Sequence, residues 1–271
     1  MSIYRLEQLT VRHLGGGRPA ALHAIDLAVA PGEQLALIGP SGAGKTTLLA
    51  TLACAHAPAE GVFDVFGADP WRLSEGERHR LRARLFLAPQ TPPLPPRQRV
   101  VSAVLAARLP HWSLWQALKS LAKPAAPDAA FDALARFQLG HKLYARVDRL
   151  SGGERQRCAL ARMLLSSAEV FLVDEPLSAL DPTLAQLTIT TLQQEAAARQ
   201  ATLICSLHQV DMARANFTRI VGLRDGRIVF DAPRERVSDA MIAALYANDS
   251  APAPSPARQE TPERLAVGAC Y

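Results

Sequence analysis

Hydrophobic residues gather in short runs that polar and helical segments separate. Apolar runs at "QLALIG" (34–39) and "RLFLAP" (84–89) predict strands, and two further runs, "EVFLVDEP" (169–176) and "ATLICSLH" (201–208), are short and continuously apolar. Runs of this length without alternation are typical of strands buried on both faces. Strands that alternate with helical segments predict an α/β fold with a parallel sheet.

Other segments alternate between apolar and polar positions, which indicates strands with one exposed face. The N-terminal segment 2–13, "SIYRLEQLTVRH", predicts such a strand, and we expect further strands at 24–29 and 61–67. The segment 219–231, "RIVGLRDGRIVFD", holds two alternating runs around an Asp-Gly pair. That arrangement predicts a β-hairpin.

The middle of the chain has a different pattern. Residues 97–147 are mostly helical in periodicity and are interrupted by prolines, so we expect a helical insertion into the sheet. From residue 248 onward the chain is rich in proline, alanine and serine. We therefore expect one domain over residues 1–247 and a disordered tail over residues 248–271.

Composition narrows the possible classes of protein. The chain has 271 residues, 49% of them hydrophobic, which is enough for a sizeable core. The formal net charge of +5 is compatible with a nucleic-acid or membrane partner, but the basic residues are scattered, which favours a solvated arginine-rich surface. The N-terminus lacks a signal-peptide pattern, and no apolar run approaches the ~20 residues that span a bilayer. We expect a soluble chain with any membrane role mediated by a partner.

The cysteines do not indicate a metal site. The four cysteines share no ligand spacing, and Cys158 and Cys205 lie in apolar segments. We expect both to be small core residues, which suits a reducing compartment.

A phosphate-binding motif follows the strand predicted at "QLALIG" (34–39). The motif G-x-x-x-x-G-K-[ST] is met between that strand and a helix, which is the context that it requires. Glycines let successive backbone N–H groups point at an anion, the lysine adds a charge at the phosphates, and the threonine offers a hydroxyl to Mg²⁺. The residues expected to bind nucleotide are Gly39, Pro40, Ser41, Gly42, Ala43, Gly44, Lys45, Thr46 and Thr47.

Two carboxylates end the strand "VFLVDEP". Asp174 at the end of this strand is placed to reach a magnesium ion, and Glu175 is the candidate to polarise an attacking water. Without a metal or another polar partner, two carboxylates directly after four apolar residues would be half-buried and unpaired, which is unfavourable. By themselves the two motifs indicate only a P-loop nucleotidase.

The stretch "LSGGERQRCALARML" (150–164) begins a helix with two glycines. Ser151 and Glu154 form the pattern of a capping box. That local role leaves Gly152 and Gly153 unexplained, because glycine weakens a helix and most residues are tolerated in the first turn. Bare N–H groups at a helix start suit an anion. We expect a second phosphate-binding surface, used when two subunits pair head to tail around ATP.

The motifs together resemble those of the ATP-binding cassette (ABC) family of transporter ATPases. The matching segments occur in the family's order: "GPSGAGKT" (Walker A), "LAPQ" (Q-loop), "LSGGE" (signature), "VFLVDEP" (Walker B), "SALD" (D-loop) and "SLHQVD" (switch histidine). The resemblance implies a P-loop NTPase with a RecA-like core, an N-terminal antiparallel β subdomain and an inserted helical subdomain at about residues 91–165. It also implies ATP and Mg²⁺ as cofactors.

The same resemblance implies a role for each motif residue. Glu175 would be the general base, His208 would hydrogen-bond the γ-phosphate, and Gln90 would contact Mg²⁺ and the attacking water. The metal ligands would be Thr46, Gln90 and Asp174. Asp181 would face the partner's site across a homodimer. The family stacks an aromatic residue on adenine; here His13 is the nearest match and Tyr4 lies too early.

Two classes of ABC protein are possible, a transport ATPase and a soluble ATPase acting on nucleic acid or ribosomes. Nothing between the Q-loop and the signature has the sustained heptads of a coiled-coil insertion, which favours transport without a nucleic-acid partner. A single cassette without a fused membrane span resembles bacterial import ATPases. Such a subunit would work with integral membrane permease subunits, and indirectly with a periplasmic binding protein, at the cytoplasmic face of the inner membrane.

Three segments further resemble the phosphonate-importer subgroup: 107–121, 175–182 and 207–231. The expected cargo is phosphonate or a related phosphorus oxyanion, with polar amino acids or phosphite as the alternatives. Trp112 and Trp115 in the first segment suit either a permease contact or packing inside the helical subdomain.

Overall fold

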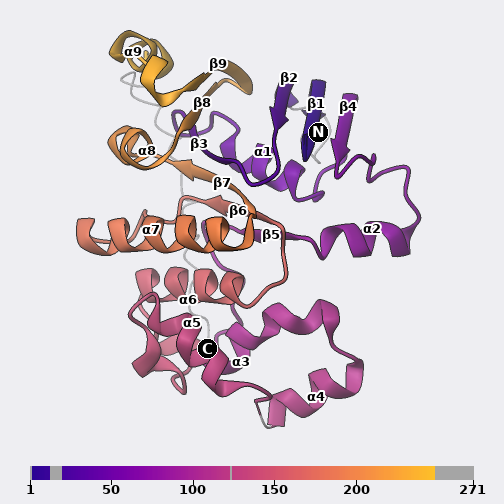
Figure 1. Ribbon diagram of the computed structural model, residues 1–271, viewed down its shortest axis with the longest axis vertical. Helices are drawn as coiled ribbons and strands as arrows, with labels where there is room; N and C mark the ends of the chain where they lie inside the picture. The colour runs from indigo at the N-terminus through magenta and orange to yellow at the C-terminus, as the bar shows by residue number, and fades with distance from the viewer. Residues whose placement is uncertain (1, 13–19, 123, 248–271) are drawn as a thin grey trace, which may run out of the picture.

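The computed structural model describes residues 2–12, 20–122 and 124–247. Among these residues the chain forms a six-stranded sheet in the order β5-β6-β7-β3-β8-β9 and a three-stranded sheet in the order β2-β1-β4. Helices cover the larger sheet, so the α/β fold with an antiparallel N-terminal sheet is confirmed (Figure 1).

The larger sheet combines the four apolar runs with the predicted hairpin at 219–231. Strands β5, β6, β7, β3 and β8 pair in parallel, and β9 closes the edge as an antiparallel neighbour of β8. Every residue of β6 and β7 is buried, as their sequences predict. The strands are β3 (Gln34–Ile38), β5 (Leu85–Ala88), β6 (Val170–Asp174), β7 (Thr202–Leu207), β8 (Arg219–Arg224) and β9 (Arg227–Pro233).

The turn between β8 and β9 is a tight hairpin at the predicted place. Asp225 has φ 49° and Gly226 has φ 70°, which is the left-handed pair of a type I′ turn. A Cβ on Gly226 would lie 2.6 Å from the backbone oxygen of Ala21, so the turn packs directly on β2. The hairpin therefore joins the two sheets.

The smaller sheet holds β1 (Tyr4–Arg12), β2 (Ala20–Val29) and β4 (Glu60–Val65), all antiparallel. Gln8 interrupts the alternation of β1 with φ 49°, and its backbone N–H donates to Asp26 at 2.8 Å. Tyr4 is fully buried and donates its hydroxyl to the Leu52 carbonyl at 3.0 Å. That bond explains why a tyrosine side chain can be buried here.

Helices fill the connections between the strands of the larger sheet. The α-helices of the described residues are α1 (Lys45–Leu52), α2 (Glu75–Arg82), α3 (Val100–Leu105), α4 (Leu114–Ala122), α5 (Pro127–Ala135), α6 (Gly152–Leu164), α7 (Pro182–Arg199), α8 (Val210–Asn216) and α9 (Asp239–Tyr246). Short 3-10 turns are η1 (Ala106–His111), η2 (Gly140–Lys142), η3 (Val147–Arg149) and η4 (Arg234–Arg236). Helices α3 to α6 lie between β5 and β6 in sequence and form the end of the molecule opposite β1, β2 and β4 (Figure 1).

Two hydrophobic clusters lie on the two faces of the larger sheet. In β3, Leu35 and Leu37 belong to the cluster shared with the smaller sheet, whereas Ala36 and Ile38 belong to the cluster shared with the helical region. This alternation explains why the strand is apolar at every position: both faces are covered. The phosphate-binding loop therefore leaves a strand that packing holds from both sides.

Several expectations about individual residues can now be compared with the fold. Cys158 and Cys205 are buried core residues, as predicted. Helix α2 was not predicted from the sequence between residues 68 and 83; it begins at a capping box of Ser74 and Glu77. No helix of the described ranges combines the length and the hydropathy that crossing a bilayer requires. His13 and the tail 248–271 lie outside the described residues.

Candidate nucleotide-binding site

The phosphate-binding loop runs from the end of β3 into α1. Gly39 has φ 152°, and a Cβ there would lie 1.9 Å from the backbone oxygen of Leu223. Gly44 caps α1 with φ 102°, and no side chain caps this helix or adds an acid to its first turn. Glycine at these two positions lets the loop curl tightly and leaves the N–H groups at the start of α1 without a side-chain acceptor.

The Lys45 side chain folds back onto the first residues of this loop. Its side chain is buried, and Nζ donates to the carbonyl oxygens of Gly39 at 2.7 Å and of Pro40 at 3.0 Å. A buried ammonium group needs such acceptors. The loop thus holds a cation and a helix N-terminus together, which is the charge arrangement that suits phosphate.

Asp174 joins the P-loop to the next strands of the sheet. The hydroxyl of Thr46 donates to Asp174 Oδ2 at 2.8 Å, and the hydroxyl of Ser206 donates to Oδ1 at 2.6 Å. Asp174 and Ser206 are register partners on β6 and β7, so the parallel pairing places them side by side. A hydroxyl and a carboxylate are oxygen ligands of the kind that Mg²⁺ prefers.

Glu175 is the centre of the site. Its backbone has φ 49°, a conformation that non-glycine residues rarely adopt, and its side chain is buried. Gln90 Nε2 donates to Oε2 at 2.6 Å, and His208 Nε2 lies 2.5 Å from Oε1. The Q-loop glutamine, the Walker B glutamate and the switch histidine therefore meet at one carboxylate, although 85 residues separate Gln90 from Glu175.

The start of α6, unlike that of α1, is capped by side chains of its own chain. The Ser151 hydroxyl accepts from the backbone N–H of Glu154 at 3.2 Å, and Glu154 Oε2 accepts from the backbone N–H of Ser151 at 2.8 Å, which is the predicted capping box. Lys142 Nζ lies 3.2 Å from the other carboxylate oxygen. The Ser151 N–H first, and Lys142 after it, lower the pKa of Glu154.

The two glycines of this helix have different surroundings. A Cβ on Gly152 would meet nothing within 4 Å, whereas a Cβ on Gly153 would lie 2.7 Å from the backbone oxygen of Ala179. Gly153 thus lets α6 approach the turn after Glu175, which explains this glycine within its own chain. Gly152 faces open space.

Asp181 ends that turn and begins α7. One of its carboxylate oxygens accepts from the backbone N–H groups of Thr183 and Leu184, both at 3.0 Å. Pro182 occupies the first helical position, where no N–H is needed. Asp181 is therefore a helix cap within its own chain.

A family model described as ABC transporter matches residues 22–178, which hold the P-loop, Gln90, the signature and Glu175. The chain belongs to the ABC transporter family. Within the family it is an ATPase domain, because the matched region carries the nucleotide-binding motifs and the fold of the solved cassettes described next.

Curated relatives cover nearly the whole chain. The "Phosphonates import ATP-binding protein PhnC" of Polaromonas sp. (strain JS666) is 56% identical over 90% of this chain and 88% of that protein. The "Phosphonates import ATP-binding protein PhnC 1" of Pseudomonas aeruginosa (strain PAO1) is 51% identical over 95% of this chain and 98% of that protein.

A solved structure has the same fold. It is a dimeric ATP-binding cassette in a post-hydrolysis state bound to ADP and Pi, with a TM-score of 0.73, 25% identity, and coverage of 85% of this chain and 98% of that chain. The cassette of cbiO1 from Clostridium perfringens, at 20% identity and a TM-score of 0.72, shares the fold alone.

The structure brings some motif residues of this ABC domain together and leaves others apart. Hydrogen bonds or close contacts join Thr46 to Asp174, and Gln90 and His208 to Glu175. Within the described residues, no hydrogen bond connects Ser151–Glu154 or Asp181 to the P-loop.

Two further residues support Glu175 and were missed in the sequence. Ser206 Oγ accepts from the Glu175 backbone N–H at 2.9 Å while its own proton goes to Asp174, and Gln156 Nε2 donates to the Glu175 carbonyl at 2.5 Å. Ser206 could have been found as a polar residue at the end of an apolar strand. Gln156 could not have been identified from the sequence, because it lies between two arginines in the polar segment "GGERQR", whose residues are expected to be exposed.

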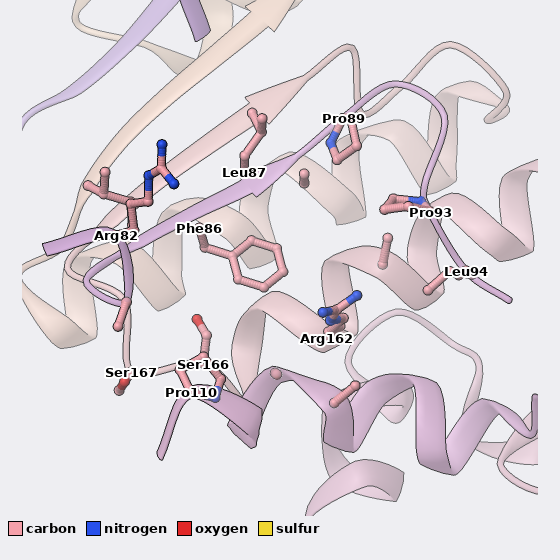
Figure 2. Close-up of a pocket in the computed structure, with 16 residues that line it drawn as sticks. Arg82, Phe86, Leu87, Pro89, Pro93, Leu94, Pro110, Arg162, Ser166 and Ser167 are labelled. Carbon is pink, nitrogen blue, oxygen red and sulfur yellow. The ribbon is translucent and has the colours of Figure 1, made fainter. Parts of the chain in front are cut away.

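A cavity lies beside the Q-loop, between the sheet and the helical region. It encloses about 270 Å³ between β5, η1 and α6, and Pro89, Phe86 and Pro110 line it (Figure 2). The guanidinium of Arg162 faces this cavity, and its Nε is buried without a hydrogen-bond partner among the described residues. Burial lowers the pKa of this arginine.

Proposed function

We propose that the chain is the ATP-hydrolysing subunit of a bacterial ABC importer that takes up phosphonate or a related phosphorus oxyanion. Relatives named as phosphonates import ATP-binding proteins, 51–57% identical over about nine-tenths of the chain, support the cargo. The observation that carries the catalytic part is the convergence of Gln90 and His208 on the Glu175 carboxylate, beside the P-loop and Asp174.

Nucleotide binding would use the P-loop as it stands. Backbone N–H groups of the loop, other than Pro40, which has none, and those at the start of α1 would face the phosphates, and Lys45 would exchange its two loop carbonyls for phosphate oxygens. Thr46, Asp174 and Gln90 offer a hydroxyl, a carboxylate and an amide oxygen, a set that fits Mg²⁺. When bound, Mg²⁺ neutralises charge on the β- and γ-phosphates.

Catalysis would centre on Glu175. Its carboxylate orients a water in line with the γ-phosphorus and accepts the proton of that water as the new P–O bond forms and the bond to ADP breaks. Gln90 and His208 now occupy both oxygens of this carboxylate. Nucleotide would draw His208 toward the γ-phosphate and Gln90 toward Mg²⁺, which frees Glu175 for water.

The complete site would need a second copy of the chain. Ser151, Gly152, Gly153 and Glu154 of one subunit, with Asp181 nearby, would face the nucleotide held by the P-loop of the other. The open space around Gly152 supports this arrangement, as does the dimeric state named for the solved cassette at 25% identity. The adenine-stacking role of His13 remains part of this proposal.

Coupling to a permease would use the cavity beside the Q-loop. Pro89 lines this cavity, and the adjacent Gln90 contacts Glu175, so an inserted segment would sense the state of the catalytic site. The unpaired Nε of Arg162 favours a carboxylate on that segment. The subunit would lie peripherally on the cytoplasmic face of the inner membrane, with the periplasmic binding protein acting through the permease.

The test is reconstitution with the candidate permease and binding protein in proteoliposomes. We expect a phosphonate to stimulate ATP hydrolysis and to accumulate in the transport compartment, with Glu175→Gln as the inactive control. Stimulation by phosphite or a polar amino acid, but by no phosphonate, would replace the cargo and leave the ATPase assignment intact. Absence of ATP hydrolysis in every arrangement would contradict both.

A further inference from the structure

Helix α4 and the η1 turn before it present apolar side chains to solvent. Leu114 is 78% exposed, Trp115 73% and Leu118 53%. On a helix these three residues lie on one face. Leu109 of η1 is also exposed, so the apolar surface continues into the preceding turn.

Side chains of the helix's own first turn fix its start. The Ser113 backbone N–H donates to Gln116 Oε1 at 2.8 Å, and the Gln116 N–H donates to Ser113 Oγ at 3.3 Å, so a capping box fixes its first turn. Its orientation is the reverse of an ordinary surface helix, because Ser120 is buried while Leu118 is exposed. The tryptophans divide accordingly: Trp112 packs on the core and Trp115 points outward.

The sequence segment that contains α4 and η1 carries side-chain charge of one sign. Residues 91–127 contain no aspartate or glutamate, and their basic residues are Arg97, Arg99, Arg108, Lys119 and Lys123. Of these, Lys119 lies on α4 beside Leu118 and is exposed, and Arg108 lies on η1 beside Leu109. Neither forms an ion pair with a described residue. Elsewhere in the domain, acids accompany the exposed basic residues in pairs such as Arg84–Glu169.

We propose that α4 and the end of η1 dock on the surface of an anionic lipid bilayer, with Leu114, Trp115 and Leu118 in the headgroup region and Lys119 at the lipid phosphates. Tryptophan and leucine on one face of a helix with nearby cations are the composition of an interfacial helix. Tryptophan favours the membrane–water boundary, and each lysine near an anionic surface adds attraction.

The position of α4 in the fold agrees with this occupant. It lies at the lower right edge of the molecule in Figure 1, and η1, which precedes it, lines the cavity beside the Q-loop. A permease segment in that cavity would bring the same edge toward the membrane. Lipid binding by α4 requires neither the proposed cargo nor a permease segment in the cavity, because the lipid surface alone is the ligand.

The first test is flotation of the full chain with vesicles that contain no protein. We expect binding to phosphatidylcholine–phosphatidylglycerol vesicles, little binding to pure phosphatidylcholine vesicles, and a loss of binding at high salt. Leu114→Ser with Trp115→Ser should lower the affinity about tenfold or more, and Lys119→Gln about fivefold. Tyr144→Ser is the matched control: Tyr144 is 63% exposed in the same helical region but outside α4, and its loss should change nothing.

Fluorescence gives a second measurement that does not rely on weakened binding. Anionic vesicles should shift the tryptophan emission of the chain to the blue, and Trp115→Phe should remove most of that shift while retaining vesicle affinity. Thermal unfolding and ATP hydrolysis without permease should stay unchanged in all α4 variants, which separates this inference from the proposed function.

Three results would overturn the inference. The first is equal vesicle affinity of the native chain and the α4 variants. The second is an absence of vesicle binding together with weakened assembly with the detergent-solubilised permease, which would make the surface a protein contact. The third is an absence of vesicle binding together with an altered oligomeric state, which would assign the surface to a second copy.

Discussion

The N-termini of α1 and α6 are both glycine-rich, yet the chain completes them in opposite ways. At α1, Gly44 caps the helix without a side chain, and the buried Lys45 adds a positive charge. At α6, Ser151 and Glu154 satisfy backbone donors themselves, and Lys142 balances the carboxylate. The α1 end thus carries, within one chain, a charge arrangement that suits phosphate, whereas the α6 end has its charges balanced and leaves open space around Gly152.

Two helix starts with similar glycine-rich sequences can therefore differ in whether side chains of the same chain cap them. At α1 the groups proposed for catalysis lie within the same chain: the Thr46 hydroxyl donates to Asp174, and Glu175 follows it in sequence. At α6 the only packed glycine, Gly153, serves contact with the backbone of Ala179. Variants at the α1 end should therefore change ATP binding by the isolated chain, whereas variants at the α6 end that preserve its cap and packing should change only hydrolysis that needs a second copy.

The largest effect is expected for Glu175→Gln. Removal of a positioned general base lowers kcat about 10²–10⁴-fold, while the P-loop and its affinity for ATP stay unchanged. Steady-state hydrolysis and calorimetric ATP binding measure the two quantities, and gel filtration with ATP should show an accumulated dimer. Ordinary turnover in this variant would exclude Glu175 as the base.

Lys45→Ala tests the P-loop end alone. Loss of one charge-assisted contact with phosphate should weaken ATP binding about 10- to 150-fold, since such hydrogen bonds contribute roughly 1.5–3 kcal/mol. Calorimetry on the isolated chain measures this without any dimer. Gly152→Asp is the control at the other end: it should leave the ATP affinity of the monomer unchanged, and an equal loss in both variants would contradict the contrast.

Mixing these variants tests whether the α6 end acts on the other subunit. Lys45→Ala and Gly152→Asp should each abolish most hydrolysis, the second by placing a carboxylate against phosphate. In a mixed head-to-tail dimer, one site carries both changes and the other carries neither. We therefore expect the mixture to recover part of the native rate, well above either variant alone. No recovery would indicate that the signature serves its own chain.

A smaller effect separates the two glycines of α6. Gly153→Ala should lower the free energy of unfolding by about 1–3 kcal/mol, because a Cβ only 2.7 Å from the Ala179 oxygen forces the turn to shift. Gly152→Ala is the matched control and should not destabilise the fold, since nothing lies within 4 Å. Urea unfolding measures both free energies. Equal free energies of unfolding for the two variants would show that the fold tolerates a Cβ at Gly153 next to the Ala179 oxygen.

The smallest effect concerns the pH dependence of the capped end. The pKa of Glu154 is lowered in the fold, so its ionised carboxylate stabilises the protein above its unfolded pKa of about 4.3. That stabilisation is lost as the pH falls through the lower folded pKa. The stability difference between the native chain and Glu154→Gln should therefore shrink below about pH 4. A difference independent of pH would mean that the charge has no role in the cap.

Much of the site could be predicted because its parts are local. The curl of residues 39–44, the charge of Lys45 and the paired acids at 174–175 each depend on a few consecutive residues after a buried strand. The hairpin at Asp225 and Gly226 is equally local, since the turn requires left-handed backbone at those two positions. The resemblance to the ABC family then supplied the order of the remaining motifs.

The contacts around Glu175 depend on the order of the strands in the sheet. Gln90, Ser206 and Gln156 reach it from the end of β5, from β7 and from α6, and no spacing in the sequence encodes that meeting. Side-chain direction is likewise a tertiary property: Trp112 and Trp115 lie three residues apart, yet one packs on the core and the other faces solvent. The sequence determined which backbone conformations and charges were available; packing of distant segments, driven by burial of both faces of the sheet, decided which of them meet.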